Sequence, residues 1–461
     1  MRGCGFRIGI LFARSARLFR SLARSLDAWS IHVPMAGVSR RLVSRAHADG
    51  RQVFVFTVNE PADMRRMNEL GVDGIFSDFP DRWTARWIQV WKSGCLRLSL
   101  APVMELSPSL QGIAQPRWPA QRAWEWRSAQ PWRVGCNFLP STATNQLEMW
   151  QPDTFDPATI DRELGWLAAL GMNSMRVFLH DLLWTTDSTG FLDRMDQYLS
   201  IAAGHGISTL FVFFDSCWHP FPSAGKQRDP EPGVHNAGWV QSPGVRILRD
   251  PAAFARLEAY VTGVAGRFRN DLRVEGWDIW NEPDNFNGNT YGVRDIFEAK
   301  AEVVLPLIAQ AFRWVRTGRP VQPVTSGVWH WQDQSWDDRS PLHQFQVEAS
   351  DIISFHCYAP PGSTQQAVEA LKRHNRPIVC TEYMARPLGS TFQAILPLFK
   401  NEGVAAYNWG SISGRSQTIY PWDSWQTPYP PEPPLWFHDV LRADGTPYIK
   451  AETDLIRSLT H

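Results

Sequence analysis

The chain has 461 residues, with 46 basic and 46 acidic side chains, and 44% of its residues are hydrophobic. A balanced charge creates no global field that would attract nucleic acid or an anionic surface, so we expect neither as a partner. No apolar run approaches the roughly 18 residues that a transmembrane helix needs, and we therefore expect no membrane span. The length allows two or three domains.

The cysteines form no recognisable disulfide or metal-binding pattern. There are six, with no Cys-x-x-Cys pair and no zinc-like histidine spacing: Cys4, Cys95, Cys136, Cys217, Cys357 and Cys380. Four of them stand within or beside predicted strand ends, which favours buried free thiols over a disulfide framework or a metal site. We expect neither a metal nor a cofactor.

Short alternating segments fill the N-terminal part of the chain. We expect strands at residues 29–33, 53–58 and 72–76, and helices at residues 38–48 and 61–70. This β-α-β-α-β order predicts a parallel sheet. The arginine-rich opening is compatible with a targeting presequence, but its apolar core is short for a secretory signal. The cellular compartment of the protein stays undecided at this point, with the cytoplasm favoured over secretion.

Two motifs in this segment point to a known family. They read Phe-Thr-Val-Asn at residues 56–59 and Gly-Val-Asp-Gly-Ile-Phe-Ser-Asp-Phe-Pro at residues 71–80. Residues 1–85 thus resemble the carboxyl-terminal part of glycerophosphodiester phosphodiesterases, which are metal-dependent enzymes. The His-Arg-Gly and Glu-x-Asp motifs of that family are missing upstream, so we expect a partial half-barrel without its chemistry. Residues 86–130 have no clean period and are expected to form a linker with little regular structure.

From residue 131 to 461 the strand–helix alternation is regular. The expected strands are 133–138, 174–179, 208–214, a run ending before Pro283, 321–328, 352–358, a run ending at Glu382, and 405–409. The expected helices between them are 157–170, 191–205, 251–268, one from Arg294, 364–374 and 391–401. Eight such units in order predict a (β/α)8 TIM barrel, so the whole chain is α/β. The long loop 215–250 after the third strand is expected to be functional.

Two of these strands end in a glutamate. Residues 274–285 read Val-Glu-Gly-Trp-Asp-Ile-Trp-Asn-Glu-Pro-Asp-Asn, and Pro283 must end the strand because it cannot continue a sheet ladder. Residues 377–382 read Pro-Ile-Val-Cys-Thr-Glu. Side chains at the carboxyl ends of barrel strands share one mouth. Two carboxylates there suit glycosidic bond cleavage, which needs one acid and one nucleophile or base.

The Asn-Glu-Pro on the fourth strand and the glutamate on the seventh resemble clan A glycoside hydrolases. The resemblance implies that Glu282 is the acid/base, that Glu382 is the nucleophile, and that Asn281 binds the sugar 2-hydroxyl. It implies a retaining double displacement on β-linked sugars. Each glutamate could instead cap a helix or pair with an arginine, and Asn281 could form a turn.

Further residues belong to the same expected site. Arg176 on the second strand needs a carboxylate partner if buried, and Glu382 is the candidate; an internal salt bridge without a catalytic part is the alternative. His356 and Tyr358 end the sixth strand as His-Cys-Tyr, which is similar to the clan's His-x-Tyr, and Trp409 matches its indole floor. Other candidates come from loops: Asp215, Trp218, His219, His235, Trp329 and Trp331. Some of the 23 tryptophans are expected to be platforms for sugar rings.

Two rival functions use the same features. A carbohydrate-binding barrel without activity would keep the aromatic cleft and lose the carboxylates. A metal-dependent glycerophosphodiester phosphodiesterase would rest on residues 1–85 alone. The kind of sugar, exo or endo action and the oligomeric state stay open.

Overall fold

The computed structural model describes residues 9–11, 28–76, 116–248, 250–285, 300–329 and 340–460. The chain divides into two compact units, Met1–Pro102 and Val103–His461. Among the helices within the described ranges, none is long and apolar enough to cross a membrane. Cys136, Cys217, Cys357 and Cys380 are buried free thiols, as predicted; Cys4 and Cys95 lie outside the described residues.

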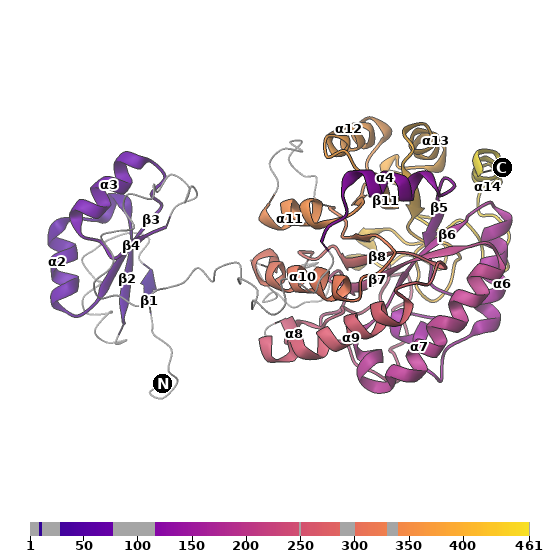
Figure 1. Ribbon diagram of the computed structural model, residues 1–461, viewed down its shortest axis with the longest axis horizontal. Helices are drawn as coiled ribbons and strands as arrows, with labels where there is room; N and C mark the ends of the chain where they lie inside the picture. The colour runs from indigo at the N-terminus through magenta and orange to yellow at the C-terminus, as the bar shows by residue number, and fades with distance from the viewer. Residues whose placement is uncertain are drawn as a thin grey trace. The chain divides into compact units, whose positions relative to one another are not determined.

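The first unit contains a parallel sheet with the strand order β1-β2-β3-β4 (Figure 1). Its elements are β1 (Gly9–Leu11), β2 (Ser30–Pro34), η1 (Met35–Gly37), α2 (Arg40–Ala48), β3 (Gln52–Phe56), α3 (Pro61–Leu70) and β4 (Gly74–Ile75). Because parallel β-α-β crossovers are almost always right-handed, successive crossovers in chain order are expected to place both helices on one face of the sheet. There Ile31, Val53 and Met67 are completely buried. The predicted β-α-β-α-β order is confirmed, and β1 adds a strand that the arginine-rich opening did not predict.

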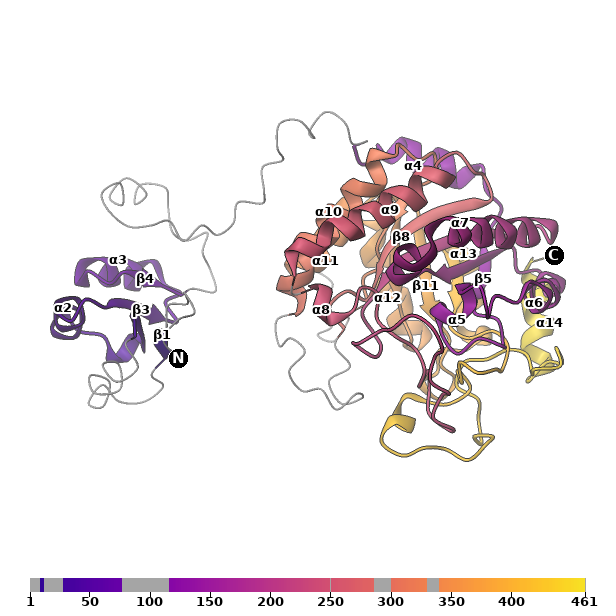
Figure 2. The same ribbon diagram turned by 90° about the horizontal axis from the view of Figure 1, so that it is seen from below.

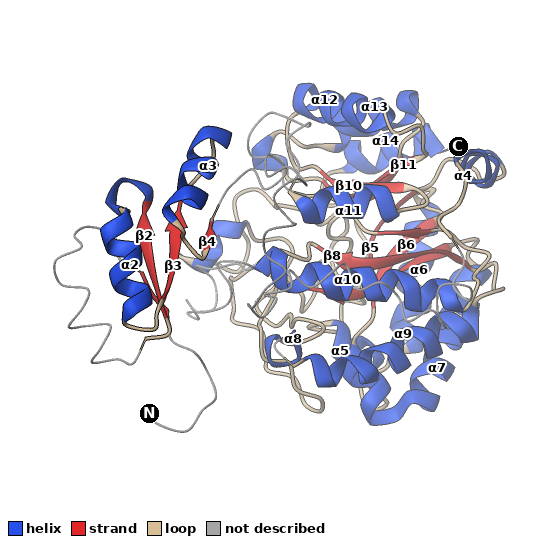
Figure 3. Cartoon of the chain, turned by 60° about the vertical axis from the view of Figure 1, so that its left-hand side comes forward, coloured by secondary structure: helices blue, strands red, loops and turns tan. Residues whose placement is uncertain are grey.

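The second unit is a barrel of eight parallel strands, which confirms the predicted fold (Figures 1 and 3). The strands are β5 (Val134–Asn137), β6 (Ser174–Phe178), β7 (Ser208–Asp215), β8 (Val274–Asn281), β9 (Val324–Thr325), β10 (Ile353–His356), β11 (Ile378–Tyr383) and β12 (Ala405–Asn408). The ladder runs in chain order from β5 to β9, and from β10 through β11 and β12 back to β5. A parallel bridge between Val328 and Phe355 joins the two ends and closes the barrel.

Helices surround these strands, so that strand residues facing outward are as buried as those facing the barrel axis (Figure 3). The α-helices are α4 (Ala120–Ser128), α5 (Gln146–Trp150), α6 (Pro157–Ala169), α7 (Asp181–Gly204), α8 (Val245–Leu248), α9 (Phe254–Phe268), α10 (Lys300–Thr317), α11 (Pro341–Ala349), α12 (Pro361–Lys372), α13 (Phe392–Glu402) and α14 (Lys450–Thr460). Short 3-10 turns are η4 (Pro251–Ala253), η5 (Arg386–Leu388) and η6 (Trp422–Trp425). Asp156 caps α6 as predicted, because its side chain accepts from the backbone N–H of Thr159.

The structure departs from the sequence prediction at several elements. Residues 120–128, expected within an irregular linker, form α4, and Trp118 beside it is buried against strand residues such as Leu210 and Val379. Helix α7 begins at Asp181, earlier than predicted, and β9 is shorter than the predicted strand. The expected start of the next helix, Arg294, lies outside the described residues. The local sequence pattern did not reveal α4, because this helix packs against strand residues that are distant in the sequence, such as Leu210 and Val379.

Strand β8 delivers the first glutamate to the barrel mouth. All eight of its residues are buried, with Trp277 and Trp280 completely so. The strand ends because Glu282 adopts a φ of +43°, in the left-handed region, and Pro283 follows. A non-glycine residue in this region costs about 1–3 kcal/mol and persists only where the surroundings enforce it. The turn points the Glu282 side chain into the pocket.

Candidate active site

A pocket of about 330 Å³ opens where the barrel strands end. Its described lining combines two carboxylates with amide, thiol, imidazole and aromatic side chains: Cys217, Trp218, His235, Asn281, Glu282, Asn285, Trp329, Tyr358, Glu382, Trp409, Trp422 and Trp425. Such a mixture, apolar walls with a few convergent polar groups, is typical of small-molecule sites.

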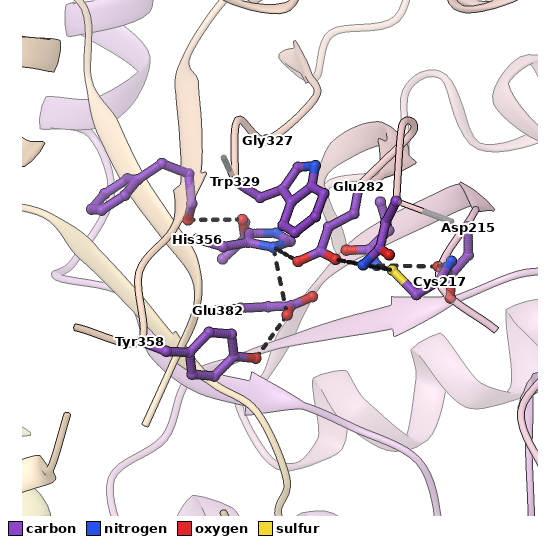
Figure 4. A network of polar contacts seen from close by, with 12 residues as sticks. Asp215, Cys217, Glu282, Gly327, Trp329, His356, Tyr358 and Glu382 are labelled. Atoms are coloured by element: carbon purple, nitrogen blue, oxygen red, sulfur yellow. Dashed lines mark hydrogen bonds and ion pairs between the residues drawn. The ribbon is translucent and has the colours of Figure 1, made fainter. Parts of the chain in front are cut away.

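Glu282 and Glu382 face each other in this pocket (Figure 4). One carboxylate oxygen of each, together with a nitrogen of His356, lies within 4.8 Å of the others. Glu282 is 8% exposed and Glu382 is 5% exposed. Two carboxylates this close in a buried site do not readily ionise together, so their hydrogen-bond partners decide which one holds the charge.

Glu382 has the stronger anion-stabilising partners. The Arg176 guanidinium donates to its Oε1 at 2.8 Å, and the Tyr358 hydroxyl donates to its Oε2 at 2.8 Å. Burial raises the pKa of Glu382, while the charge of Arg176 and the Tyr358 hydrogen bond oppose that rise. A charged donor favours the ionised form more than neutral donors do. Glu382 is therefore the better placed of the two to be the anion.

Glu282 has neutral partners. Its Oε2 accepts from Asn285 Nδ2 at 2.6 Å and from the Cys217 thiol at 3.1 Å, and its Oε1 lies 2.8 Å from His356 Nδ1. Burial raises the pKa of Glu282, and the hydrogen bonds from Asn285 and Cys217 only partly oppose this. A carboxyl group with a raised pKa next to an ionised one is suited to carry a proton.

His356 stands between the two carboxylates. Its Nδ1 lies 2.8 Å from Glu282 and 3.5 Å from Glu382. Burial lowers the pKa of His356 to about 4, so the ring is neutral near pH 7. The trio of Glu282, His356 and Glu382 is compact enough to hold a metal ion. The Arg176 charge already compensates Glu382, which makes the trio a less favourable cation site.

Arg176 anchors a larger buried network. It is fully buried and bonds Asp278 through Nε at 3.0 Å and Nη2 at 2.8 Å, and Asn281 Oδ1 at 2.7 Å. It also donates to Asn137 Oδ1 at 2.8 Å. Asn281 Nδ2 in turn donates to Asp215 at 3.2 Å, and burial raises the pKa of Asp215 to about 6. The network holds Asn281 and Glu382 in one arrangement.

Aromatic rings form the walls. The Trp218 and Trp409 rings are stacked with centroids 5.9 Å apart, and Trp239 packs against both. On another wall, the Tyr358 ring meets Trp422 edge-on at 5.0 Å. The Trp329 indole is held by Asp284, to which its Nε1 donates at 2.7 Å. Indole faces fixed in this way offer flat platforms for a ring-shaped ligand.

The structure brings most of the predicted site residues together. Seven of them line the pocket: Asn281, Glu282, Glu382, Tyr358, Trp409, Trp218 and Trp329. Arg176 and His356 lie behind the lining and contact the carboxylates, and Arg176 has Glu382 as its predicted partner. His235 also lines the pocket, and Asp215 supports it from below, whereas His219 contacts Phe221 outside the described lining. Trp331 lies outside the described residues.

Sequence reasoning missed several residues of the site. Asp278 shares Arg176 with Glu382, and its position before the Asn-Glu-Pro motif was the available signal. Cys217 and Asn285 contact Glu282, and Lys300 Nζ binds the carbonyl oxygens of Ser216 (3.0 Å) and Asn285. Burial lowers the pKa of Lys300 to about 8. No motif marks Cys217 or Lys300, because their contacts join segments that are far apart in the sequence, whereas Asn285 stands only three residues after Glu282.

Comparisons with known sequences concern the N-terminal unit. The model of the glycerophosphoryl diester phosphodiesterase family matches residues 7–82, which confirms the resemblance predicted for that segment. A curated glycerophosphodiester phosphodiesterase from Bacillus altitudinis is 53% identical over 47 residues. That match covers 10% of this chain and only 19% of the relative.

Comparisons with solved structures concern the barrel. A GH5_18 protein from Streptomyces cattleya in complex with GlcNAc is 15% identical, covers 71% of this chain and 79% of its own, and has a TM-score of 0.48. An exo-beta-1,4-mannosidase from Opitutaceae bacterium strain TAV5 is 18% identical over 71% of this chain and 59% of its own (TM-score 0.47). A beta-mannanase from the blue mussel Mytilus edulis is 16% identical over 64% of this chain and 89% of its own (TM-score 0.45). The roles of the pocket residues rest on the geometry of this chain.

Proposed function

We propose that the protein is a retaining glycoside hydrolase that cleaves O-glycosidic bonds of β-linked sugars. The observation that carries the proposal is the pair Glu282 and Glu382, with carboxylate oxygens within 4.8 Å of each other. Retaining enzymes place their two carboxyl groups about 5–5.5 Å apart, whereas inverting enzymes leave about 6.5–9.5 Å for a water molecule. The β configuration of the substrate rests on the resemblance of the Asn-Glu-Pro motif to clan A.

The roles of the two glutamates follow from their partners. Glu382, ionised beside Arg176 and Tyr358, attacks the anomeric carbon and forms a covalent glycosyl-enzyme. Glu282 donates its proton to the departing oxygen and then accepts a proton from the incoming water. Asn281 binds the sugar 2-hydroxyl, and Trp409 forms the floor under the sugar ring. The substrate is a carbohydrate, and no step requires a metal or a cofactor.

Two amide substitutions test these roles on a panel of aryl β-glycosides. Glu382→Gln should abolish turnover on every substrate, because no covalent intermediate can form. Glu282→Gln should keep kcat/KM, which reports the first step, on dinitrophenyl glycosides, whose leaving groups need little protonation, and lose it on poorer leaving groups. Identical behaviour of the two variants across leaving groups would contradict the assignment.

A matched control and a stereochemical readout complete the experiment. Glu275→Gln removes another buried glutamate of β8, one that accepts from Ser174 and Ser208. It should lower stability without producing a leaving-group dependence. Proton NMR of the first product formed from a β-glycoside should show the β anomer. First appearance of the α anomer would exclude a retaining mechanism.

A further inference from the structure

A second hollow lies beside the catalytic pocket. Its volume is about 530 Å³, and Trp422 lines both hollows. We call it the apolar groove; it is bounded by Leu388, Trp422, Tyr429, Leu435 and Phe437, together with three prolines and Asp423, among the described residues. It belongs to the segment between β12 and α14 and to the turn η5. Figure 2 shows the former, in gold and yellow, projecting from one end of the barrel.

The apolar groove exposes large hydrophobic side chains to solvent. Leu388 is 43% exposed, Trp422 is 42% exposed and Leu435 is 41% exposed. Exposed apolar residues scattered singly need no explanation, but a contiguous patch in a concave surface marks an interaction site. Three such side chains around one hollow therefore point to an apolar ligand.

The chemistry of the walls argues against a sugar in this groove. Proline has no backbone N–H to donate, and leucine and phenylalanine side chains have no polar atoms. The carboxylate of Asp423 already accepts from the Tyr429 hydroxyl at 3.1 and 3.2 Å. Hydroxyl groups placed against the proline, leucine and phenylalanine walls would lose water without gaining partners, which is unfavourable.

The groove is held in shape by buried contacts below it. Arg386 pairs with Glu452 at 2.6 Å and donates to the carbonyl oxygens of Trp436 and Asp439, both at 2.9 Å. The backbone N–H of Tyr429 donates to Gly233 at 3.0 Å, which ties this wall to the loop after β7. A preformed hollow binds its ligand without the cost of ordering a loop.

Trp422 connects the groove to the chemistry. The Tyr358 hydroxyl donates to Glu382, and the Tyr358 ring meets Trp422 edge-on at 5.0 Å. One aromatic ring therefore separates the carboxylate from the shared wall. The catalytic pocket, at about 330 Å³, is the smaller of the two hollows, so a larger substrate has to continue beyond it.

We propose that the apolar groove binds the aglycone of the substrate, and that this aglycone is an alkyl chain. The proposal rests on the proposed function, because it assumes that the sugar occupies the pocket at Glu282 and Glu382. The enzyme is thus expected to prefer alkyl glycosides over oligosaccharides of similar size.

The test is a chain-length series on the full-length protein. Butyl to octyl β-glycosides share one leaving-group chemistry and differ only in methylene groups. Full burial of a methylene is worth about fourfold in binding, and a half-open groove should yield about twofold. We therefore expect kcat/KM to rise about fifteenfold from butyl to octyl. A flat series, or a gain with each added sugar and none with each methylene, would overturn the proposal.

Matched variants separate the groove from general surface effects. Leu388→Asp combined with Leu435→Asp should flatten the chain-length series, so that kcat/KM on the octyl glycoside falls to about its value on the butyl glycoside. Leu272→Asp is the control: this leucine is 86% exposed and precedes β8, at the opposite end of the strand from the pocket. It should keep the full chain-length dependence. A chain-length dependence that survives the double substitution would exclude the apolar groove as the site that binds the alkyl chain.

A binding measurement distinguishes failure of this proposal from failure of the proposed function. Saturation-transfer NMR with 1-octanol needs no turnover and should show contact with the native protein but not with the double variant. If octanol binds in this way and no glycoside is hydrolysed, the groove is an alkyl-binding site and the proposed glycoside hydrolase function is wrong. If glycosides are hydrolysed and octanol contacts both proteins equally, or neither, the groove proposal fails.

Discussion

Substitution of Arg176 by methionine tests the electrostatic core of the site. Methionine is of similar length and keeps the apolar stem, but it has no donor. Arg176 is fully buried and donates to two carboxylates, Glu382 and Asp278, and to Asn137 and Asn281. Removing one partner of a buried ion pair costs about 3–5 kcal/mol, because the remaining charge is uncompensated. We expect a loss of that size in the free energy of unfolding.

The same change should move the pH dependence of catalysis. A positive charge within hydrogen-bonding distance lowers a carboxyl pKa by about 1–3 units, and Arg176 Nη1 lies 2.8 Å from Glu382. Without it the pKa of Glu382 rises, so this proposed nucleophile stays protonated up to a higher pH. The acidic limb of the kcat/KM profile should therefore move to higher pH. Below that limb, each unit of displacement lowers the rate about tenfold.

Arg386→Met is the matched control. Arg386 is also a buried arginine with a carboxylate partner, Glu452, but it lies outside the pocket. Urea unfolding should show a loss of stability in both variants, whereas only Arg176→Met should displace the acidic limb. An unmoved limb with an unchanged rate in Arg176→Met would refute the electrostatic role and leave Arg176 as a structural ion.

Three further predictions follow from other parts of the chain. Lys300→Met frees the carbonyls of Ser216 and Asn285, and Asn285 holds Glu282, so kcat/KM should fall about tenfold on poor leaving groups. An equal loss of kcat/KM on dinitrophenyl glycosides would contradict a link between Lys300 and the proposed acid Glu282. Burial lowers the pKa of His235 to about 3, below the unfolded value of about 6.5, so this histidine's contribution to stability is complete above pH 6.5 and is lost as pH falls. Between pH 6.5 and 5 it should remove about 2 kcal/mol from the unfolding free energy, and His235→Gln should show a correspondingly smaller drop in urea titrations. A chain beginning at Met104 should fold and keep the glycosidase rate, since the barrel has all eight strands; a soluble but inactive product would show that the N-terminal unit completes the site.

Much of the fold could be read from local patterns. The strand–helix alternation predicts the barrel, because each unit carries its own apolar periodicity and its own turn residues. Pro283 places the end of β8, and the two strand-end glutamates meet because parallel strands share one carboxyl edge. The pairing of Arg176 with Glu382 was predictable for the same reason: a buried cation on a barrel strand requires a carboxylate within reach.

The remaining features depend on contacts between distant segments, on which the local pattern carries no information. The sequence of helix α4 resembles a linker, because the burial of the neighbouring Trp118 depends on strand residues that are distant in the sequence. Asp278 and Glu275 sit in a strand that is buried on both faces, so alternation does not show which side chains face the axis. Cys217 donates to Glu282 directly, and Lys300 binds the carbonyl of Asn285. Both contacts depend on how packing brings these segments together. The unequal partners of the two glutamates, and hence their different affinities for a proton, arise only when eight strands close into one barrel.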